Sequence, residues 1–520
     1  MLTFTDKSQC CGCTACASIC PKQCIQMIED KEGFLYPQID TTVCVDCGLC
    51  EKVCPVLHPV QAKERPAVFA AINNNSIIRE QSSSGGIFTL LAEQTIQKGG
   101  VVFGACFDKK WNVVHRYTET LGGLSVFRGS KYVQSDMGTS FQDAKHFLEQ
   151  GREVLFSGTP CQIAGLKNYL RKSYSNLFTI DLVCHGTPSP DIWRKYLLET
   201  ICKRLDLKNT KNLNVDDYIS TICFRTKENG WKKYHVRFKY KNGEVESIPF
   251  YRNPYMSVFL SNLSLRPCCY SCPAKLYQIQ SDMTLADFWG VNEVYSEMDD
   301  DKGCSLIFVN NKEKLELIHS LDCKIKRQSI DNAIKYNPCI LSSVKKPGNR
   351  NFFFFVYRMK GFYTSYQAVT SNSTLMRITR KILQFFMRIA ILTQPLDTNY
   401  GGILQCYALQ TFLERMGHEV QVLTKLRYGS SYYVIYPLAV CKRMVKRYML
   451  GKDVAILKAP HEIRRKNIDK FIQQYIHQYK RRIFTEKIAY QFDAVVVGSD
   501  QVWRPAYSKP IEEAFLSFFR

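Results

Sequence analysis

Two copies of one cysteine pattern lie within the first 55 residues of this 520-residue chain. Each copy reads C-x2-C-x2-C-x3-C and is followed directly by a proline, Pro21 in the first copy and Pro55 in the second. The eight cysteines are Cys10, Cys13, Cys16, Cys20, Cys44, Cys47, Cys50 and Cys54. Eight thiols in so short a segment limit the fold strongly, because they leave little room for a conventional hydrophobic core.

This spacing is the one by which ferredoxin-like modules bind two [4Fe–4S] clusters. Three closely spaced thiolates hold one cluster, and the fourth reaches across to the other cluster. The expected ligand sets are Cys10, Cys13, Cys16 and Cys54 for one cluster, and Cys44, Cys47, Cys50 and Cys20 for the other. Zinc or a disulfide framework is the alternative, but zinc sites use two C-x2-C pairs and rarely repeat eight cysteines with trailing prolines.

Length and composition predict about three domains in a reducing compartment. A chain of 520 residues exceeds one hydrophobic core, and 45% hydrophobic residues are enough to bury several. No apolar run is long enough to span a membrane and no secretory leader precedes Cys10, so we expect neither. Lone cysteines such as Cys106 and Cys202 fit a reducing cytoplasm. We therefore expect a cytoplasmic protein, either free or peripheral at the inner membrane surface.

The chain has a net charge of +23, and much of it lies between residues 425 and 487, which contain 16 Lys or Arg and only four acidic residues. A solvated helical face is one interpretation of this stretch. Attraction to an anionic membrane surface or to a lipid-linked glycan is the other. No helix-turn-helix, zinc-finger or RNA-recognition signature accompanies the charge, so no nucleic-acid partner is expected.

The pattern along the chain predicts a multidomain protein of α/β and α+β class. The expected domains are a two-cluster ferredoxin-like module (1–60), a mixed α/β reductase domain (66–345), a linker (346–387) and a partial Rossmann-like α/β lobe (388–520). Apolar runs predict strands at 68–72, 101–104, 153–156 and 178–182, with a helix at 87–97. The last segment predicts a strand at 389–393, a helix at 402–415 and strands at 420–423 and 494–497.

Chemistry-bearing residues of the middle segment follow its predicted strands. Cys161 and Cys184 each stand just after a strand, which is where open α/β sheets place their ligands. Cys269 and Cys272 add a C-x2-C pair. Together these four thiols could supply a third iron–sulfur cluster; packed thiols and a zinc half-site are the alternatives. The run 82–86 precedes a helix and reads either as a phosphate-binding loop or as an ordinary N-cap.

Residues 1–340 resemble the family of coenzyme F420 hydrogenase/dehydrogenase beta subunits, in its form with an N-terminal two-cluster ferredoxin domain. The motifs that carry the resemblance lie at residues 83–89, 129–135, 156–162, 184–186, 269–272 and 281–290. Members of that family bind FAD and pass electrons between clusters and an organic hydride carrier. The resemblance implies Cys161, Cys184, Cys269 and Cys272 as cluster ligands, and Ser84, Gly85, Gly86, Lys131, Gly158 and Thr159 as flavin-lining residues. Cys268 is read as a bystander, because relatives often have serine there.

The resemblance and the cysteine sets predict an iron–sulfur flavoprotein oxidoreductase. Electrons would pass from a soluble donor protein through the clusters to FAD, which converts one-electron into two-electron transfer, and then to a small-molecule hydride acceptor. His185 reads either as a proton donor to the reduced substrate or as a turn histidine bonded to backbone. A non-catalytic electron-transfer subunit is the alternative function.

Residues 388–520 resemble the start of the polysaccharide pyruvyl transferase family. The resemblance is carried by residues 389–393, 399–410 and 497–505, and it implies phosphoenolpyruvate chemistry in polysaccharide biosynthesis. Runs 399–402 and 498–500 would be its ligand-binding turns. A two-lobed transferase needs roughly 300 residues, whereas this segment has 133. We therefore expect no pyruvyl transfer by this chain alone, unless a partner supplies a second lobe.

Overall fold

The computed structural model divides the chain into two compact units, Met1–Thr370 and Ser371–Arg520. Each unit is considered by itself. The structure describes residues 6–59, 65–207, 209–210, 213–275, 280–371, 388–393, 396, 400–415, 418–424, 442, 444–445, 447, 449, 461–478, 492 and 494–497.

The cysteine-rich segment folds into two short helices and one hairpin. These elements are α1 (Ala15–Ile19), β1 (Ile25–Glu29), β2 (Leu35–Ile39) and α2 (Leu49–Lys52). Strands β1 and β2 pair antiparallel, with Ile25 opposite Ile39. The hairpin turn is held by Asp30, whose carboxylate accepts hydrogen bonds from the backbone N–H groups of Glu32 and Phe34. Short elements suffice here because the cysteine loops occupy most of the segment.

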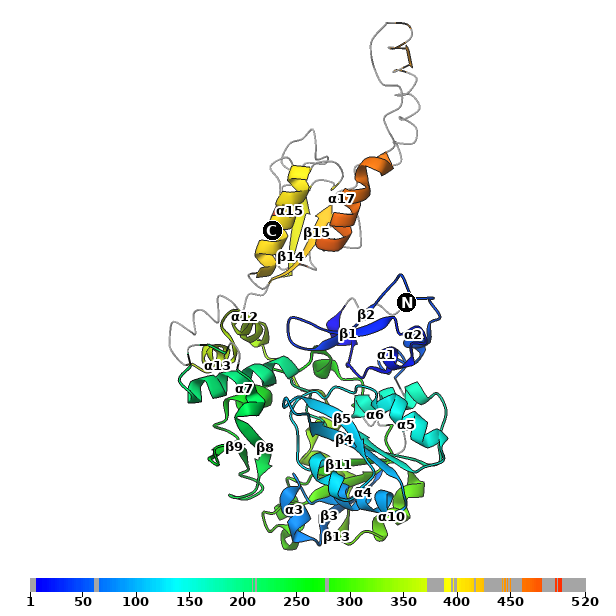
Figure 1. Ribbon diagram of the computed structural model, residues 1–520, viewed down its shortest axis with the longest axis vertical. Helices are drawn as coiled ribbons and strands as arrows, with labels where there is room; N and C mark the ends of the chain where they lie inside the picture. Colours follow the sequence, from blue (N-terminus) through cyan, green and yellow to red (C-terminus); the bar gives the residue numbers. More distant parts are fainter. Residues whose placement is uncertain are drawn as a thin grey trace. The chain divides into compact units, whose positions relative to one another are not determined.

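An eight-stranded mixed sheet forms the body of the first unit (Figure 1). Its strand order is β13-β3-β12-β11-β7-β6-β4-β5. The strands are β3 (Ala67–Asn73), β4 (Val101–Phe107), β5 (Val113–Thr118), β6 (Val154–Gly158), β7 (Leu177–Leu182), β11 (Met283–Asp287), β12 (Ser305–Val309) and β13 (Cys323–Gln328). The strands predicted at 68–72, 101–104, 153–156 and 178–182 are therefore present, as β3, β4, β6 and β7.

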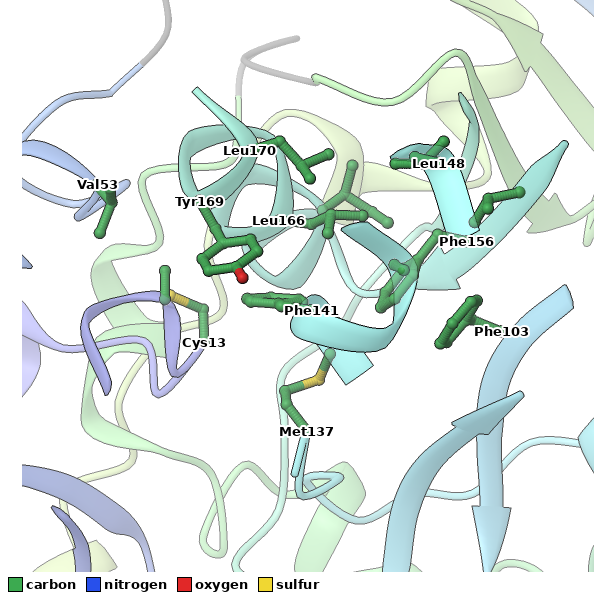
Figure 2. Close-up of a cluster of buried hydrophobic side chains, with 14 of the residues drawn as sticks. Cys13, Val53, Phe103, Met137, Phe141, Leu148, Phe156, Leu166, Tyr169 and Leu170 are labelled. Carbon is green, nitrogen blue, oxygen red and sulfur yellow. The ribbon is translucent and has the colours of Figure 1, made fainter. Parts of the chain in front are cut away.

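Helices cover both faces of this sheet. Strand residues alternate between the faces, so Phe103 and Phe156 pack beneath α5 (Ser140–Glu149) and α6 (Pro160–Leu170). Val102 and Leu155 point the other way, toward α4 (Ile87–Gln97), which is the helix predicted there. Figure 2 shows the first of these layers, in which Cys13 of the cysteine-rich segment joins the cluster. Part of the ferredoxin-like segment thus shares a core with the α/β body.

Further elements of the first unit surround the sheet. They are α3 (Ser76–Gln81), α7 (Pro190–Arg204), β8 (Ile219–Thr226), β9 (His235–Tyr240), β10 (Val245–Pro249), α8 (Pro254–Leu260), α9 (Val291–Val294), α10 (Leu315–His319), α11 (Ile330–Lys335), α12 (Arg350–Lys360) and α13 (Phe362–Thr370). Strands β8, β9 and β10 form a separate antiparallel sheet.

The predicted linker differs from the structure over residues 350–370. Two helices, α12 and α13, occupy this stretch, and Phe353 and Phe362 are fully buried. The backbone N–H of Phe362 donates to Glu199 of α7, which ties α13 to the body. The phenylalanine run looks like a composition shift in the sequence, but it supplies the buried face of a helix. The first compact unit accordingly ends at Thr370.

The second unit contains a three-stranded parallel sheet of order β15-β14-β16. Its elements are β14 (Arg388–Thr393), α15 (Tyr400–Arg415), β15 (Glu419–Thr424), α17 (His461–Tyr475) and β16 (Ala494–Val497). The predicted strands and the predicted helix of this segment are therefore present. Ile391 and Val422 of the strands pack with Ile403 and Cys406 of α15 and with Ile472 of α17.

Within the described part of the chain, no helix combines the length and the apolar character that membrane crossing requires.

Candidate functional site

The second cysteine run surrounds a hollow whose empty space, together with the adjoining open solvent, is about 370 Å³. Four predicted cluster ligands line this outer hollow: Cys20, Cys44, Cys47 and Cys50. Cys47 is exposed and the other three are half-buried, so the site lies close to solvent. The structure thus gathers Cys20 of the first repeat with three cysteines of the second repeat, which is the crossed grouping that the sequence predicted.

The remaining four predicted ligands form an inner set with less exposure. Cys10, Cys13 and Cys54 are each 7% exposed. Burial and the neighbouring thiols of Cys10 and Cys54 raise the pKa of Cys16 to about 12. Burial also raises the pKa of Cys54, with contributions from Cys10 and Cys50. Mutual repulsion between thiolates shows that these sulfur atoms crowd one another, and a cationic iron core would relieve that repulsion.

The inner set lies directly against α6. A Cβ atom placed on Gly165, in the middle of α6, would lie 2.8 Å from Cβ and 2.9 Å from Sγ of Cys13. Cys13 also lies beside Phe141 and Tyr169 in the shared core (Figure 2). Glycine at position 165 is therefore what lets the ferredoxin-like segment approach this helix so closely.

A third thiol set gathers at the start of α6. Helix α6 begins with a capping box, in which Thr159 and Gln162 satisfy each other's backbone N–H groups. Pro160 is the first residue of the helix. This cap fixes Cys161 at the helix N-terminus. Burial raises the pKa of Cys184 well above its usual value, and the nearby thiols of Cys269, Cys161 and Cys272 add to the rise. The four thiols predicted for a third cluster are thus electrostatic neighbours.

Polar groups around the third set suit anionic sulfur. The Cys269 thiol has its pKa lowered to about 6 by a hydrogen bond from Cys268 and by the backbone N–H of Thr187, which lies 3.4 Å from Sγ. Lys275 Nζ donates to the carbonyl oxygen of Cys184 at 2.7 Å. A hollow of about 360 Å³ adjoins the set and is lined by Cys184, Lys275 and Cys339 among others. The lowered pKa belongs to Cys269, whereas burial contributes to raised pKa values of Cys161, Cys184 and Cys272.

Cys11 bridges the inner and third sets. Cys11 packs in one buried cluster with Cys13 and Cys161, and its pKa is raised well above the usual value, first by the thiol of Cys13. Cys268 lies on the same boundary, because it interacts with both Cys269 and Cys11. Ligands of the inner set and of the third set therefore belong to the same packed cluster.

The residues predicted to line a flavin all lie at one edge of the central sheet. Strands β4, β6, β7 and β11 are parallel, and β3 runs in the same direction because two antiparallel pairings separate it from β11. Gly158 is the last residue of β6 and Thr159 follows it, and Gly85 packs against the end of β3. Ser130 N–H donates to Ser83 Oγ at 2.6 Å, which joins the loop before α4 to the loop that carries Lys131. Carboxyl ends of parallel strands are where such sheets bind ligands.

Each predicted flavin residue also has a contact within the protein. Ser84 Oγ donates to the Cys304 carbonyl oxygen at 2.8 Å. A Cβ atom on Gly85 would lie 2.5 Å from the Ala71 carbonyl oxygen. Lys131 Nζ donates to two backbone carbonyl oxygens, and burial lowers its pKa to about 8. Gly86 begins α4 with a φ of 82°, and Thr159 caps α6. These contacts position the loops whether or not a flavin is bound.

His185 follows β7, and both of its ring nitrogens have protein partners. Nε2 lies 2.6 Å from Asn262 Oδ1, and Nδ1 lies 3.7 Å from Cys339 Sγ. Burial lowers the pKa of the imidazole, although the Asn262 contact opposes the shift. A neutral histidine with a partner at each ring nitrogen orients its neighbours. The role of His185 as a proton donor stays a prediction.

Several functional candidates were not singled out from the sequence. Cys24 Sγ lies 3.3 Å from Cys20 Sγ and lines the outer hollow, although Cys24 stands outside the repeat. Asp181, on β7, is fully buried, and burial raises its pKa to about 7, although the hydroxyls of Thr284 and Ser281 oppose part of the rise. An acidic residue inside an otherwise apolar strand is the signal that could have marked Asp181.

The predicted ligand-binding turns of the second unit, residues 399 and 498–500, lie outside the described residues, as does most of the basic stretch 425–487. Gly401 and Gly402 lie in the first turn of α15.

Comparisons with known proteins bear on two stretches of the chain. Residues 9–57 match the family described as "4Fe-4S dicluster domain". Residues 151–332 match the family that comprises the C-terminal part of the coenzyme F420 hydrogenase/dehydrogenase beta subunit. A subunit of the F(420)H(2) dehydrogenase from Methanosarcina mazei is 23% identical over 273 residues, which cover 48% of this chain and 73% of that protein.

Shorter and structural similarities accompany these matches. Ferredoxin 7Fe of Hydrogenibacillus schlegelii is 48% identical over 42 residues, covering 8% of this chain and 47% of that protein. A chain of the F420-reducing [NiFe] hydrogenase complex from Methanosarcina barkeri has a TM-score of 0.35 at 16% identity, covering 53% of this chain and 91% of that chain.

The cysteine sets and these matches define an iron–sulfur electron-transfer protein of the oxidoreductase class. More particularly, the chain carries a 4Fe-4S dicluster domain, which holds two [4Fe–4S] clusters, and is related to the beta subunits of coenzyme F420 hydrogenase/dehydrogenase.

Proposed function

We propose that this chain is an iron–sulfur flavoprotein oxidoreductase that carries electrons inward through three [4Fe–4S] clusters. In this proposal the outer hollow holds the first cluster, the inner set holds the second, and Cys161, Cys184, Cys269 and Cys272 hold the third. The observation that carries it is one buried cluster that contains Cys11 and Cys13 and against which Cys161 and Cys269 pack, because it brings the inner and third sets together in one core.

The gradient of exposure gives the proposed path its direction. The outer hollow includes the exposed Cys47, so a soluble donor protein can reach that cluster. The inner set is buried and packs on α6, and Cys161 begins the same helix. Electrons delivered at the surface therefore have a continuous route toward the sheet edge.

FAD is the proposed end of the route, at the sheet edge formed by the loops that carry Ser84, Lys131 and Thr159. When bound, a flavin supplies the conversion of single electrons into a hydride for a small organic acceptor. Lys131, whose pKa burial lowers to about 8, is a buried ammonium suited to an anionic part of such a cofactor. The capping box of α6 keeps Thr159 and Cys161 in fixed positions beside it.

Anaerobic purification followed by iron, sulfide and flavin quantification tests this proposal. Three clusters require about twelve irons per chain and two require about eight, and FAD released on denaturation identifies the flavin. Cys184→Ser should remove about four irons, whereas Cys339→Ser, which changes a thiol lining the same hollow, should leave the iron content unchanged. Eight irons in the wild-type chain, unaltered by Cys184→Ser, would refute the third cluster.

The flavin measurement separates this proposal from a non-catalytic electron-transfer subunit. A chain with about twelve irons but no flavin would support the alternative, in which a separate partner chain holds the reductase site.

A further inference from the structure

Arg266 is a fully buried arginine whose hydrogen bonds converge on the inner thiol set. Its relative exposure is 0%. Nε donates to the Cys10 carbonyl oxygen at 2.8 Å, and a terminal nitrogen lies 3.4 Å from Cys10 Sγ. The same guanidinium donates to Gln134 Oε1 at 3.0 Å and to the Leu35 carbonyl oxygen at 2.9 Å. Every one of these acceptors is neutral unless the Cys10 thiol is ionised.

Arg266 differs in this respect from the other buried arginines of the described chain. Arg79 pairs with Asp300, Arg225 with Asp287 and Arg350 with Glu32. Arg266 forms no ion pair with any described Asp or Glu, although it is the most deeply buried of the four. Burying an unpaired charge is strongly unfavourable. An anion in contact with this guanidinium would remove that cost.

The surroundings of Arg266 point to the thiol side as the place of that anion. The aromatic faces of Tyr36 and Phe34 lie 4.2 Å and 5.4 Å from the guanidinium carbon and supply partial negative charge only. A Cβ atom on Gly12 would lie 2.7 Å from a terminal nitrogen of Arg266, so the cysteine loop closes directly over the cation. Cys10 is the ionisable acidic group that hydrogen-bonds to it.

We propose that Arg266 is the counter-charge of the inner cluster and raises its reduction potential, so that electrons move inward from the outer cluster. The inference rests on the proposed ligation of that cluster by Cys10. One-electron reduction adds a negative charge to the cluster, and a fixed cation in hydrogen-bond contact stabilises the reduced form more than the oxidised form. The cation in the described lining of the outer hollow is Lys22, which is exposed, so solvent and salt screen its charge more than that of the buried Arg266.

Arg266 also influences the third thiol set. The backbone N–H of Cys269 donates to the carbonyl oxygen of Arg266 at 2.9 Å. The guanidinium contacts Cys10 directly and reaches Cys269 only through space, so the larger effect falls on the inner cluster. Arg266 is therefore a positioning residue that sets the order of potentials along the route.

The test is an EPR-monitored redox titration of the full-length, cluster-loaded chain. We expect Arg266→Met to shift the reduction equilibrium of one cluster at least tenfold toward the oxidised form, which corresponds to about 59 mV for one electron. Arg266→Lys keeps the positive charge but loses the forked arrangement of N–H donors of the guanidinium. It should shift the reduction equilibrium of the same cluster in the same direction by less. Cys47→Ser, which alters an outer ligand, identifies the outer signal by its loss.

Arg350→Gln is the matched control, since Arg350 is a buried arginine that touches the ferredoxin-like segment only through Glu32. It should move no cluster equilibrium by more than twofold. If Arg266→Met keeps its iron and shifts no cluster by more than twofold, the proposal is overturned while the proposed function stands. If Arg266→Met loses iron, Arg266→Lys decides instead, and a shift of no more than twofold in every cluster of that variant would overturn the proposal. A wild-type chain without clusters would instead refute the proposed function.

Discussion

Replacing Gly165 by alanine tests the close approach between α6 and the ferredoxin-like segment. Gly165 lies in the interior of α6, where alanine is ordinarily favoured over glycine by about 1 kcal/mol. With no neighbour in the way, Gly165→Ala would therefore stabilise the protein. The structure predicts the opposite sign, because the new methyl group would meet Cβ and Sγ of Cys13 at 2.8 Å and 2.9 Å.

The size of the effect follows from those two distances. Carbon atoms pack best at about 3.5–4.0 Å, so α6 and the Cys13 loop must separate by roughly 0.7 Å or more. Overpacking of this kind costs about 1–3 kcal/mol. After subtraction of the helix gain, the free energy of unfolding should fall by roughly 0–2 kcal/mol instead of rising by about 1 kcal/mol.

Anaerobic urea unfolding, followed by the loss of cluster absorbance in the visible range, measures the change. Cys161 lies in the first turn of the same helix, so the displacement should also slow the passage of electrons from the inner cluster to the proposed third cluster in rapid-mixing reduction. Gly122→Ala is the control, because nothing lies within 4 Å of a Cβ atom at that position. A stability gain of about 1 kcal/mol in Gly165→Ala, with unchanged reduction kinetics, would refute the reasoning.

Three further predictions concern stability. The pKa of Asp181 is about 7 in the folded state and 3.8 ordinarily, so between these pH values the folded state binds a proton that the unfolded state has lost, and wild-type stability falls as pH rises. Asparagine does not titrate. The free energy of unfolding of Asp181→Asn relative to the wild type, measured with urea, should therefore rise by about 2 kcal/mol between pH 5.5 and pH 8. Arg350→Gln leaves the Glu32 carboxylate, whose side chain is 18% exposed, without its ion-pair partner and should lower the free energy of unfolding by about 1–3 kcal/mol. Thr159→Ala removes the hydroxyl from the capping box with Gln162 and should cost about 1 kcal/mol, measured by the same method.

Conservative variants serve as controls for these three changes. Thr159→Ser keeps the capping hydroxyl and should lie close to the wild type. The double variant Glu32→Gln with Arg350→Gln removes both charges and should lose less than Arg350→Gln alone. A difference between Asp181→Asn and the wild type that does not depend on pH would contradict the assignment of the raised pKa.

Local patterns were sufficient to predict four of the eight strands of the central sheet. The apolar runs at β3, β4 and β6 are largely buried on both faces, so each reads as a nearly continuous hydrophobic segment, whereas β7 includes the buried polar residues Thr179 and Asp181. The phenylalanine run of α12 is not recognisable as a helix in this way, because its burial depends on α7 and the body rather than on its own sequence. The order of the strands could not be predicted from local patterns either, because β3 and β11 both pair with β12 although they lie far apart in the chain.

The grouping of thiols divides in the same way. Cluster spacing is a local property, so the repeat alone predicted that Cys20 would join Cys44, Cys47 and Cys50. Nothing local marks Cys11 as the contact between Cys13 and Cys161, or Arg266 as the partner of Cys10, because both depend on how the ferredoxin-like segment packs on α6 and on the loop before Cys268.

By itself, the sequence determined that this protein binds two clusters, since ligand spacing within a few residues dictates which metal centres a loop can hold. The tertiary structure decided which side chains surround the ligands of those clusters. The distance between the inner and third thiol sets and the burial of an unpaired arginine depend on contacts between segments more than 100 residues apart in the chain, such as Cys11 with Cys161 and Cys10 with Arg266. Such contacts follow from packing of the whole unit, which no local pattern encodes.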